Sequence, residues 1–115
     1  MTKLLVAAVV AFAVALPAAA HGASTHTCNI RGKERKLGTT YVTALKATRV
    51  SCARAQRFVK AFHKCRHRHG KAGRCARLSG YRCSEKREAI PTQYDSRAIC
   101  TRGHRRIVQV YTQNT

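Results

Sequence analysis

Acidic residues are scarce in this chain. Four of the 115 residues are Asp or Glu, whereas 23 are Lys or Arg, which gives a formal net charge of +19. A catalytic pair of carboxylates is therefore not expected, because each acid has basic neighbours. We expect the acids to be structural ion-pair partners; they are Glu34, Glu85, Glu88 and Asp95.

Long hydrophobic runs are missing after the first twenty residues. An uninterrupted apolar run spans residues 4–16 and is followed by Pro17 and three alanines. These thirteen residues fall short of the roughly 20 needed to cross a bilayer, and the small residues after them fit a signal-peptide cleavage site. The pattern predicts a secretory signal peptide over residues 1–20, cleaved near Ala20, and a secreted product.

The 95 residues that follow have little material for a hydrophobic core. Leu, Ile, Val and Phe together contribute 14 of them, about 15%, and Trp is absent. With 22 Lys and Arg against four acids, this part has a net charge of +18, a composition typical of disordered chains. Small exported domains with an insufficient core are commonly cross-linked, so we expect disulfides to hold this fold.

Six cysteines lie in this part of the chain, and we expect all of them to form disulfides: Cys28, Cys52, Cys65, Cys75, Cys83 and Cys100. Six cysteines allow fifteen pairings, and the sequence alone does not choose among them. One pairing has a local argument, because Cys65 and Cys75 bracket a loop whose two glycines permit a turn. We predict a Cys65–Cys75 disulfide and leave the other partners open.

The order of elements predicts one basic α+β domain over residues 28–115, preceded by a flexible leader at residues 21–27. After Ser51, a favourable helix N-cap, apolar residues recur with helical period and predict an amphipathic helix over about 52–65. Residues 41–50 are rich in Thr, Val and Tyr and predict a strand. Three further strands are expected, at about 80–87, 94–101 and 104–112. The expected fold is the helix packed on a small antiparallel sheet and stapled by disulfides.

Several short motifs resemble a group of small exported actinobacterial proteins. They are Val50-Ser51-Cys52-x-x-Ala55, Gly80-Tyr81-x-Cys83, Tyr94-Asp95, Cys100-x-x-Gly103 and Tyr111-Thr112-Gln113-Asn114-Thr115. The motifs consist mainly of Cys, Gly and aromatic residues at structural spacings, and the resemblance spans most of residues 28–115. It implies architecture and export, and it names no substrate.

Potential metal ligands are dense between residues 63 and 69. His63, Cys65, His67 and His69 alternate there with Lys64, Arg66 and Arg68. Imidazole and thiolate are ligands for zinc or copper, but a divalent cation in this segment would lie among positive charges. An exported cysteine is also expected to be oxidised. We therefore expect no metal and no cofactor.

A basic nuclease could use paired histidines that exchange a proton during phosphodiester cleavage. The candidates are His63, His67, His69 and His104. Nothing in the sequence fixes two of them across a common cleft, and the positive charge by itself accounts for RNA affinity. We expect a protein without enzymatic activity, and we expect its four tyrosines to serve packing more than base stacking.

Basic side chains remain the best candidates for function. The polar face of the helix and the adjoining loop carry nine cations: Arg54, Arg57, Lys60, Lys64, Arg66, Arg68, Lys71, Arg74 and Arg77. A net charge of +18 exceeds the magnitude of about 2 to 8 that suffices for solubility, and it destabilises the fold by self-repulsion. We expect these nine residues to bind an anionic partner.

The sequence thus predicts a secreted polyanion-binding protein of the cell envelope or exterior. The partner is expected to be a cell-wall polyanion, an acidic polysaccharide, an anionic membrane or a nucleic acid. The alternatives are a cationic antimicrobial or membrane-active effector and a small basic nuclease.

Overall fold

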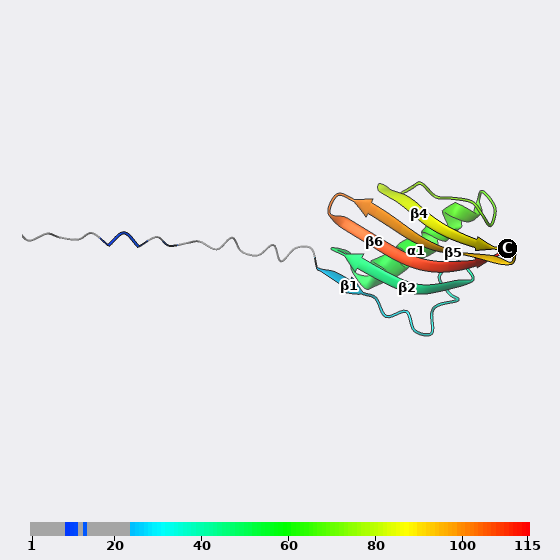
Figure 1. The fold of residues 1–115 in the computed structure, drawn as a ribbon, viewed down its shortest axis with the longest axis horizontal. Helices are drawn as coiled ribbons and strands as arrows, with labels where there is room; N and C mark the ends of the chain where they lie inside the picture. The colour runs from blue at the N-terminus through cyan, green and yellow to red at the C-terminus, as the bar shows by residue number, and fades with distance from the viewer. Residues whose placement is uncertain (1–8, 12, 14–23) are drawn as a thin grey trace, which may run out of the picture.

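The computed structural model describes residues 9–11, 13 and 24–115. Residues 24–115 form one helix and a six-stranded antiparallel sheet, and the helix crosses one face of the sheet diagonally (Figure 1). The elements in chain order are β1 (Thr25–Thr27), β2 (Tyr41–Thr48), α1 (Cys52–His67), β3 (Arg77–Leu78), β4 (Tyr81–Ile90), β5 (Gln93–Arg102) and β6 (Arg105–Asn114). The predicted α+β class is confirmed, although the sheet is larger than expected.

The sheet has the strand order β1-β2-β6-β5-β4-β3. Strands β4, β5 and β6 are ten residues each and follow one another as an antiparallel meander. Strand β2 pairs with the other side of β6, so the last strand in sequence lies inside the sheet. The edge strands β1 and β3 are three and two residues long, and such short edges limit pairing with other chains.

Helix α1 begins where the sequence predicted. Ser51 is its N-cap, and the Ser51 hydroxyl accepts a hydrogen bond from the amide of Arg54 (3.2 Å). The helix ends at His67, two residues beyond the predicted end. The side chains that it buries are Ala55, Phe58, Val59, Phe62, His63 and Arg66.

The hydrophobic core lies between α1 and the sheet. The ring of Phe58 packs on Tyr81 with centroids 4.6 Å apart, and Phe62 meets Tyr111 edge to face at 6.4 Å. Buried residues from the sheet complete this layer: Val42, Leu45, Ala47, Ala98 and Ile107. Three of the four tyrosines, Tyr81, Tyr94 and Tyr111, are buried, so their predicted packing role is confirmed.

Three disulfides cross-link the domain: Cys28–Cys52, Cys65–Cys75 and Cys83–Cys100. No cysteine is free. The predicted use of all six cysteines and the predicted Cys65–Cys75 pair are confirmed. A native disulfide stabilises a small domain by about 2 to 4 kcal/mol, mainly by restricting the unfolded chain, which offsets a core poor in aliphatic residues.

Two predicted boundaries differ most from the structure. Residues 25–27, expected in a flexible leader, form β1 and pair with β2, where the hydroxyls of Thr25 and Thr48 lie 2.7 Å apart. Strand β4 runs to Ile90, three residues past its predicted end, because it pairs with β5 along its whole length. The predicted signal peptide, residues 1–20, falls mostly outside the described residues.

Candidate anion-binding surface

The structure exposes eight of the nine cations predicted to bind an anion. They are Arg54, Arg57, Lys60 and Lys64 on α1, and Arg68, Lys71, Arg74 and Arg77 between α1 and β4. The four helix residues recur at intervals of three or four, so they lie along one side of α1. This side faces away from the sheet, because the residues between them are the ones that pack on it.

Arg66 is the exception, and its predicted place on the exposed surface is wrong. Its side chain is 0% exposed. Arg66 continues the buried row of α1 beyond Phe62 and His63, because positions three or four apart share one helix face. The sequence did not indicate this role, because burial of an arginine depends on partners that come from distant strands.

The guanidinium of Arg66 is held by neutral groups. It donates to the Tyr94 hydroxyl (2.6 Å), the Lys71 carbonyl (2.7 Å) and the Gln113 side-chain oxygen (2.9 Å). It also lies 4.8 Å from the centre of the Tyr111 ring, a cation–π distance. These acceptors and the ring electrons of Tyr111 replace the water that Arg66 loses, and the side chain serves structure.

His63 is the buried partner of Arg66. Its Nδ1 accepts from the Arg66 Nε (3.1 Å), and its Nε2 lies 2.8 Å from the Gln109 side-chain oxygen. Burial, followed by the nearby charge of Arg66, lowers the pKa of His63 to about 3. His63 is therefore a neutral imidazole near pH 7, with its proton on Nε2 and its lone pair toward Arg66.

The loop after α1 is anchored through its backbone carbonyls. Arg87 donates to the carbonyls of Ala72 and Gly73, both at 2.7 Å, and the Tyr94 hydroxyl donates to that of Lys71 at 2.6 Å. The Cys65–Cys75 disulfide closes the same loop. The exposed cations of this loop are therefore displayed on a fixed backbone.

A buried carboxylate lies beneath the same region. Glu85 forms an ion pair with Arg87 (2.9 Å) and accepts hydrogen bonds from the hydroxyls of Ser96 (2.7 Å) and Tyr111. Burial, and then the bond to Glu85, raises the pKa of Tyr111. The predicted ion-pair role of the acids is thus seen at Glu85, and Glu85–Arg87 is the one ion pair in the described part of the chain.

The open face of the sheet carries a second group of cations, which the sequence alone did not indicate. They are Lys46, Arg82, Lys86, Arg97 and Arg106, all exposed. Lys86 and Arg97 lie directly opposite each other on β4 and β5, a pairing of like charges that destabilises a sheet. Within a strand these cations occupy alternate positions, which point to the same face. This pattern can be recognised only once the limits of the strands are known.

Two of the candidate histidines, His63 and His67, lie near each other, with ring centroids 6.3 Å apart. His63 is fully buried, whereas His67, His69 and His104 are exposed. His104 lies in the turn between β5 and β6, and His67 contacts Gln113 at the end of α1 (2.9 Å). The buried His63 is oriented toward Gln109 and Arg66, so it has no free face for a substrate.

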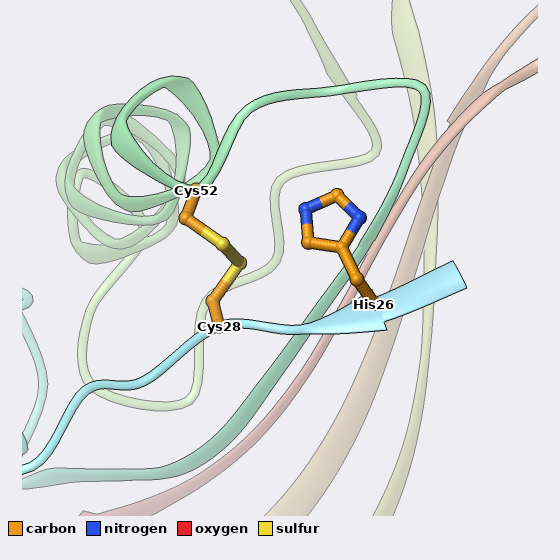
Figure 2. Close-up of side chains that lie close together, drawn as sticks. All are labelled: His26, Cys28 and Cys52. Atoms are coloured by element: carbon orange, nitrogen blue, oxygen red, sulfur yellow. A yellow bond between two sulfur atoms is a disulfide. The ribbon is translucent and has the colours of Figure 1, made fainter. Parts of the chain in front are cut away.

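One cluster in the described residues has the spacing of metal ligands. The ligand atoms of His26, Cys28 and Cys52 lie within 4.8 Å of one another (Figure 2). The sulfurs of Cys28 and Cys52 are bonded to each other, as Figure 2 shows, so neither offers a thiolate. In the histidine-rich segment, Cys65 is also in a disulfide, so it offers no thiolate to a metal either.

Comparison with protein-family models, with curated proteins and with solved structures gave no match to this chain. Within the described residues, no helix has the length and apolar character needed to cross a membrane.

Proposed function

We propose that this is a secreted, non-enzymatic protein that binds anionic polymers of the cell envelope or exterior. One observation carries the proposal: apart from Arg66 and Arg87, every Lys and Arg that the structure describes is exposed, and none of these exposed cations is in an ion pair. An unneutralised charge of this size repels itself. A polyanion would relieve that repulsion when it binds.

Export is part of the proposal. It is supported by the apolar run at residues 4–16 and by the three disulfides, which persist in oxidising compartments. The resemblance to small exported actinobacterial proteins stays a prediction, and it agrees with export.

We place the polymer on the outer side of α1 and on the loop after it. Arg57, Lys60 and Lys64 project from a single rigid element, and the loop cations stand on a backbone fixed by Arg87 and Tyr94. Cations held at fixed positions lose little freedom when a charged chain binds, which favours affinity. The open sheet face is the competing surface.

The test compares two triple variants with equal charge. Binding of duplex DNA, used as a model polyanion, would be measured by fluorescence anisotropy between 50 and 200 mM salt for the wild type, R57Q/K60Q/K64Q and K46Q/K86Q/R97Q. Each bound cation contributes about −0.9 to the log–log salt slope. We expect the helix variant to flatten the slope by roughly 2 to 3 units and the sheet variant by less than about 1 unit.

Equal flattening by both variants would mean that net charge alone governs binding, with no preferred surface. A larger effect of the sheet variant would move the site to the open face. Absence of binding at 50 mM salt would overturn the proposal. Dye release from phosphatidylglycerol vesicles, or turnover of RNA, would support the membrane-active or the nuclease alternative instead.

A further inference from the structure

A cavity of about 290 Å³ opens where the start of α1 meets the turn between β5 and β6. Its lining combines basic, hydroxyl and apolar side chains: Arg49, Val50, Ser51, Arg54, Phe58, Ser79, Tyr81, Arg102, Arg105 and Ile107. Four arginines therefore border one small space. Arg54 is the one cation of the candidate anion-binding surface that also lines the cavity. The cavity therefore lies at the N-terminal end of that surface, and Arg57, Lys60, Lys64 and the loop cations lie outside its lining.

The four arginines come from three separate parts of the chain. Arg49 lies between β2 and α1, Arg54 lies in the first turn of α1, and Arg102 and Arg105 flank the turn between β5 and β6. None of the four acidic residues lines the cavity, and the first turn of α1 contains no acid. The positive charge around this space therefore has no acidic counterpart among the residues that line it.

Two residues in the wall of the cavity have an uncommon backbone conformation. Arg49 and Ser79 are the two described non-glycine residues with positive φ, at 56° and 50°, and both line the cavity. Such conformations cost free energy and persist where the surroundings impose them. Arg102 is fixed as well, since it donates to the Ser79 carbonyl (3.2 Å) and packs over Gly80, where a Cβ atom would lie 3.0 Å from its Nε.

The apolar part of the lining matters for the kind of ligand. Phe58, Tyr81 and Ile107 are largely buried, and the two rings pack against each other, so they present a firm apolar wall. A simple inorganic anion would use the arginines and leave this wall wet. A molecule with an anionic head and an apolar or planar body would use both.

The charge of the head group follows from the number of arginines. The guanidinium fork matches phosphate and carboxylate oxygens in bidentate geometry. A phosphomonoester carries about −1.5 to −2 charges at pH 7, whereas a carboxylate or a sulfate ester carries one. Four clustered cations favour the dianion, because it neutralises more of their mutual repulsion.

We propose that this cavity binds an organic phosphomonoester, with the phosphoryl group among Arg49, Arg102 and Arg105 and the organic group against Phe58 and Tyr81. The site would bind one small molecule per protein, which goes beyond the proposed polymer binding. The two activities can therefore succeed or fail independently.

The test uses phenyl phosphate as the probe and isothermal titration calorimetry on the disulfide-bonded protein. We expect saturable binding with one site for the wild type. The R49Q/R102Q/R105Q variant should bind at least about tenfold more weakly. The control R57Q/K60Q/K64Q, which loses the same charge on the outer side of α1, should bind within about twofold of the wild type.

Two further probes test the match between ligand and cavity. Inorganic phosphate should bind more weakly than phenyl phosphate because it cannot use the apolar wall, and benzenesulfonate should bind more weakly because it is a monoanion. Equal loss of phenyl phosphate affinity in both triple variants would overturn the proposal, as would tighter binding of inorganic phosphate. The unfolding midpoint of the single variant R105Q would also be measured, so that a loss of affinity can be distinguished from a loss of the fold.

The two proposals fail in different ways. Retained DNA binding with no phenyl phosphate binding would reject the cavity proposal alone. Saturable phenyl phosphate binding with no DNA binding at 50 mM salt would support the cavity proposal and reject the polymer surface.

Discussion

The two ends of α1 use arginine in opposite ways. At the C-terminal end, Arg66 is fully buried and its donors are taken by side-chain and backbone acceptors. At the N-terminal end, Arg54 lies with three other arginines around a cavity that contains no acid. The acceptors around an arginine, and not its residue type, therefore decide whether its side chain is buried in the fold or stays exposed.

The largest effect is expected at the buried end. Replacement of Arg66 by Met keeps much of the side-chain volume but leaves the buried Nδ1 of His63 without a donor. It also removes the charged donor from the Gln113 side-chain oxygen and the Lys71 carbonyl, which keep weaker neutral partners. An unsatisfied buried acceptor costs about 1 to 3 kcal/mol, and a hydrogen bond to a charged group contributes about 1.5 to 3 kcal/mol. R66M should therefore lower the free energy of unfolding by roughly 3 to 5 kcal/mol. Urea denaturation monitored by circular dichroism would measure the change.

The matched control is Arg57 on the same helix. R57M removes an exposed cation and should change the free energy of unfolding by no more than about 0.5 kcal/mol. Similar losses of unfolding free energy in R66M and R57M would show that the buried contacts of Arg66 do not stabilise the fold. The proposed difference between the two ends of α1 would then be wrong.

Acid should weaken the buried end through His63. The unfolded chain binds a proton at this residue near the ordinary pKa of 6.5, whereas the folded pKa is about 3. The stability from neutral His63 is therefore complete above pH 6.5 and falls with decreasing pH by about 1.4 kcal/mol per unit. Between pH 6.5 and 4.5 this amounts to roughly 3 kcal/mol.

The measurement compares wild type with H63Q, whose amide can both donate and accept but does not titrate. Between pH 7 and pH 4.5, H63Q should lose less unfolding free energy than the wild type, because the carboxylates and the other histidines titrate equally in both proteins. An identical loss in the two proteins would mean that His63 takes up its proton without disturbing the fold.

A smaller effect is expected from the disulfide at the buried end. C65S/C75S removes a cross-link with a sequence separation of 10, which corresponds to about 2 to 3 kcal/mol of loop-closure free energy. The basic loop should nevertheless keep its place, because Arg87 and Tyr94 still bind its carbonyls. Hydrogen exchange of residues 69–74 would reveal whether the loop opens in the variant.

The smallest change in stability is expected at the cavity end. R102Q/R105Q reduces repulsion among the four arginines and should raise the free energy of unfolding by up to about 0.5 kcal/mol at low salt. The gain should vanish in 1 M salt, where charges are screened within about 3 Å. A loss of several kcal/mol would show that these arginines hold the fold, as Arg66 does.

Local signals were sufficient for much of the fold. Ser51 and the apolar period located α1, the Thr, Val and Tyr content located β2, and two glycines between Cys65 and Cys75 indicated their pairing. The Thr25–Thr27 strand escaped notice, because its short polar sequence becomes a strand only through pairing with β2.

The site was less predictable for a physical reason. Eight of the nine proposed cations are exposed as expected, but burial of Arg66 depends on Tyr94 and Gln113, which follow it in sequence by 28 and 47 residues. The cavity is assembled from Arg49 and Arg102 in the same long-range way. Spacing along a sequence reports neighbours on one element, and it cannot report which distant side chains will meet.

The position of β6 inside the sheet has a consequence for how the protein is made. β2 pairs with β6 across as many as 71 residues, from Tyr41 to Thr112, so a chain that emerges N-terminus first from a ribosome or a translocation channel exposes β2 long before its partner arrives. The β4–β5 hairpin and the Cys65–Cys75 loop can form earlier, because their contacts are local. During this interval the dense positive charge keeps nascent chains apart by repulsion. The same cations that are proposed to attract a partner after folding would thus protect an unpaired strand before it.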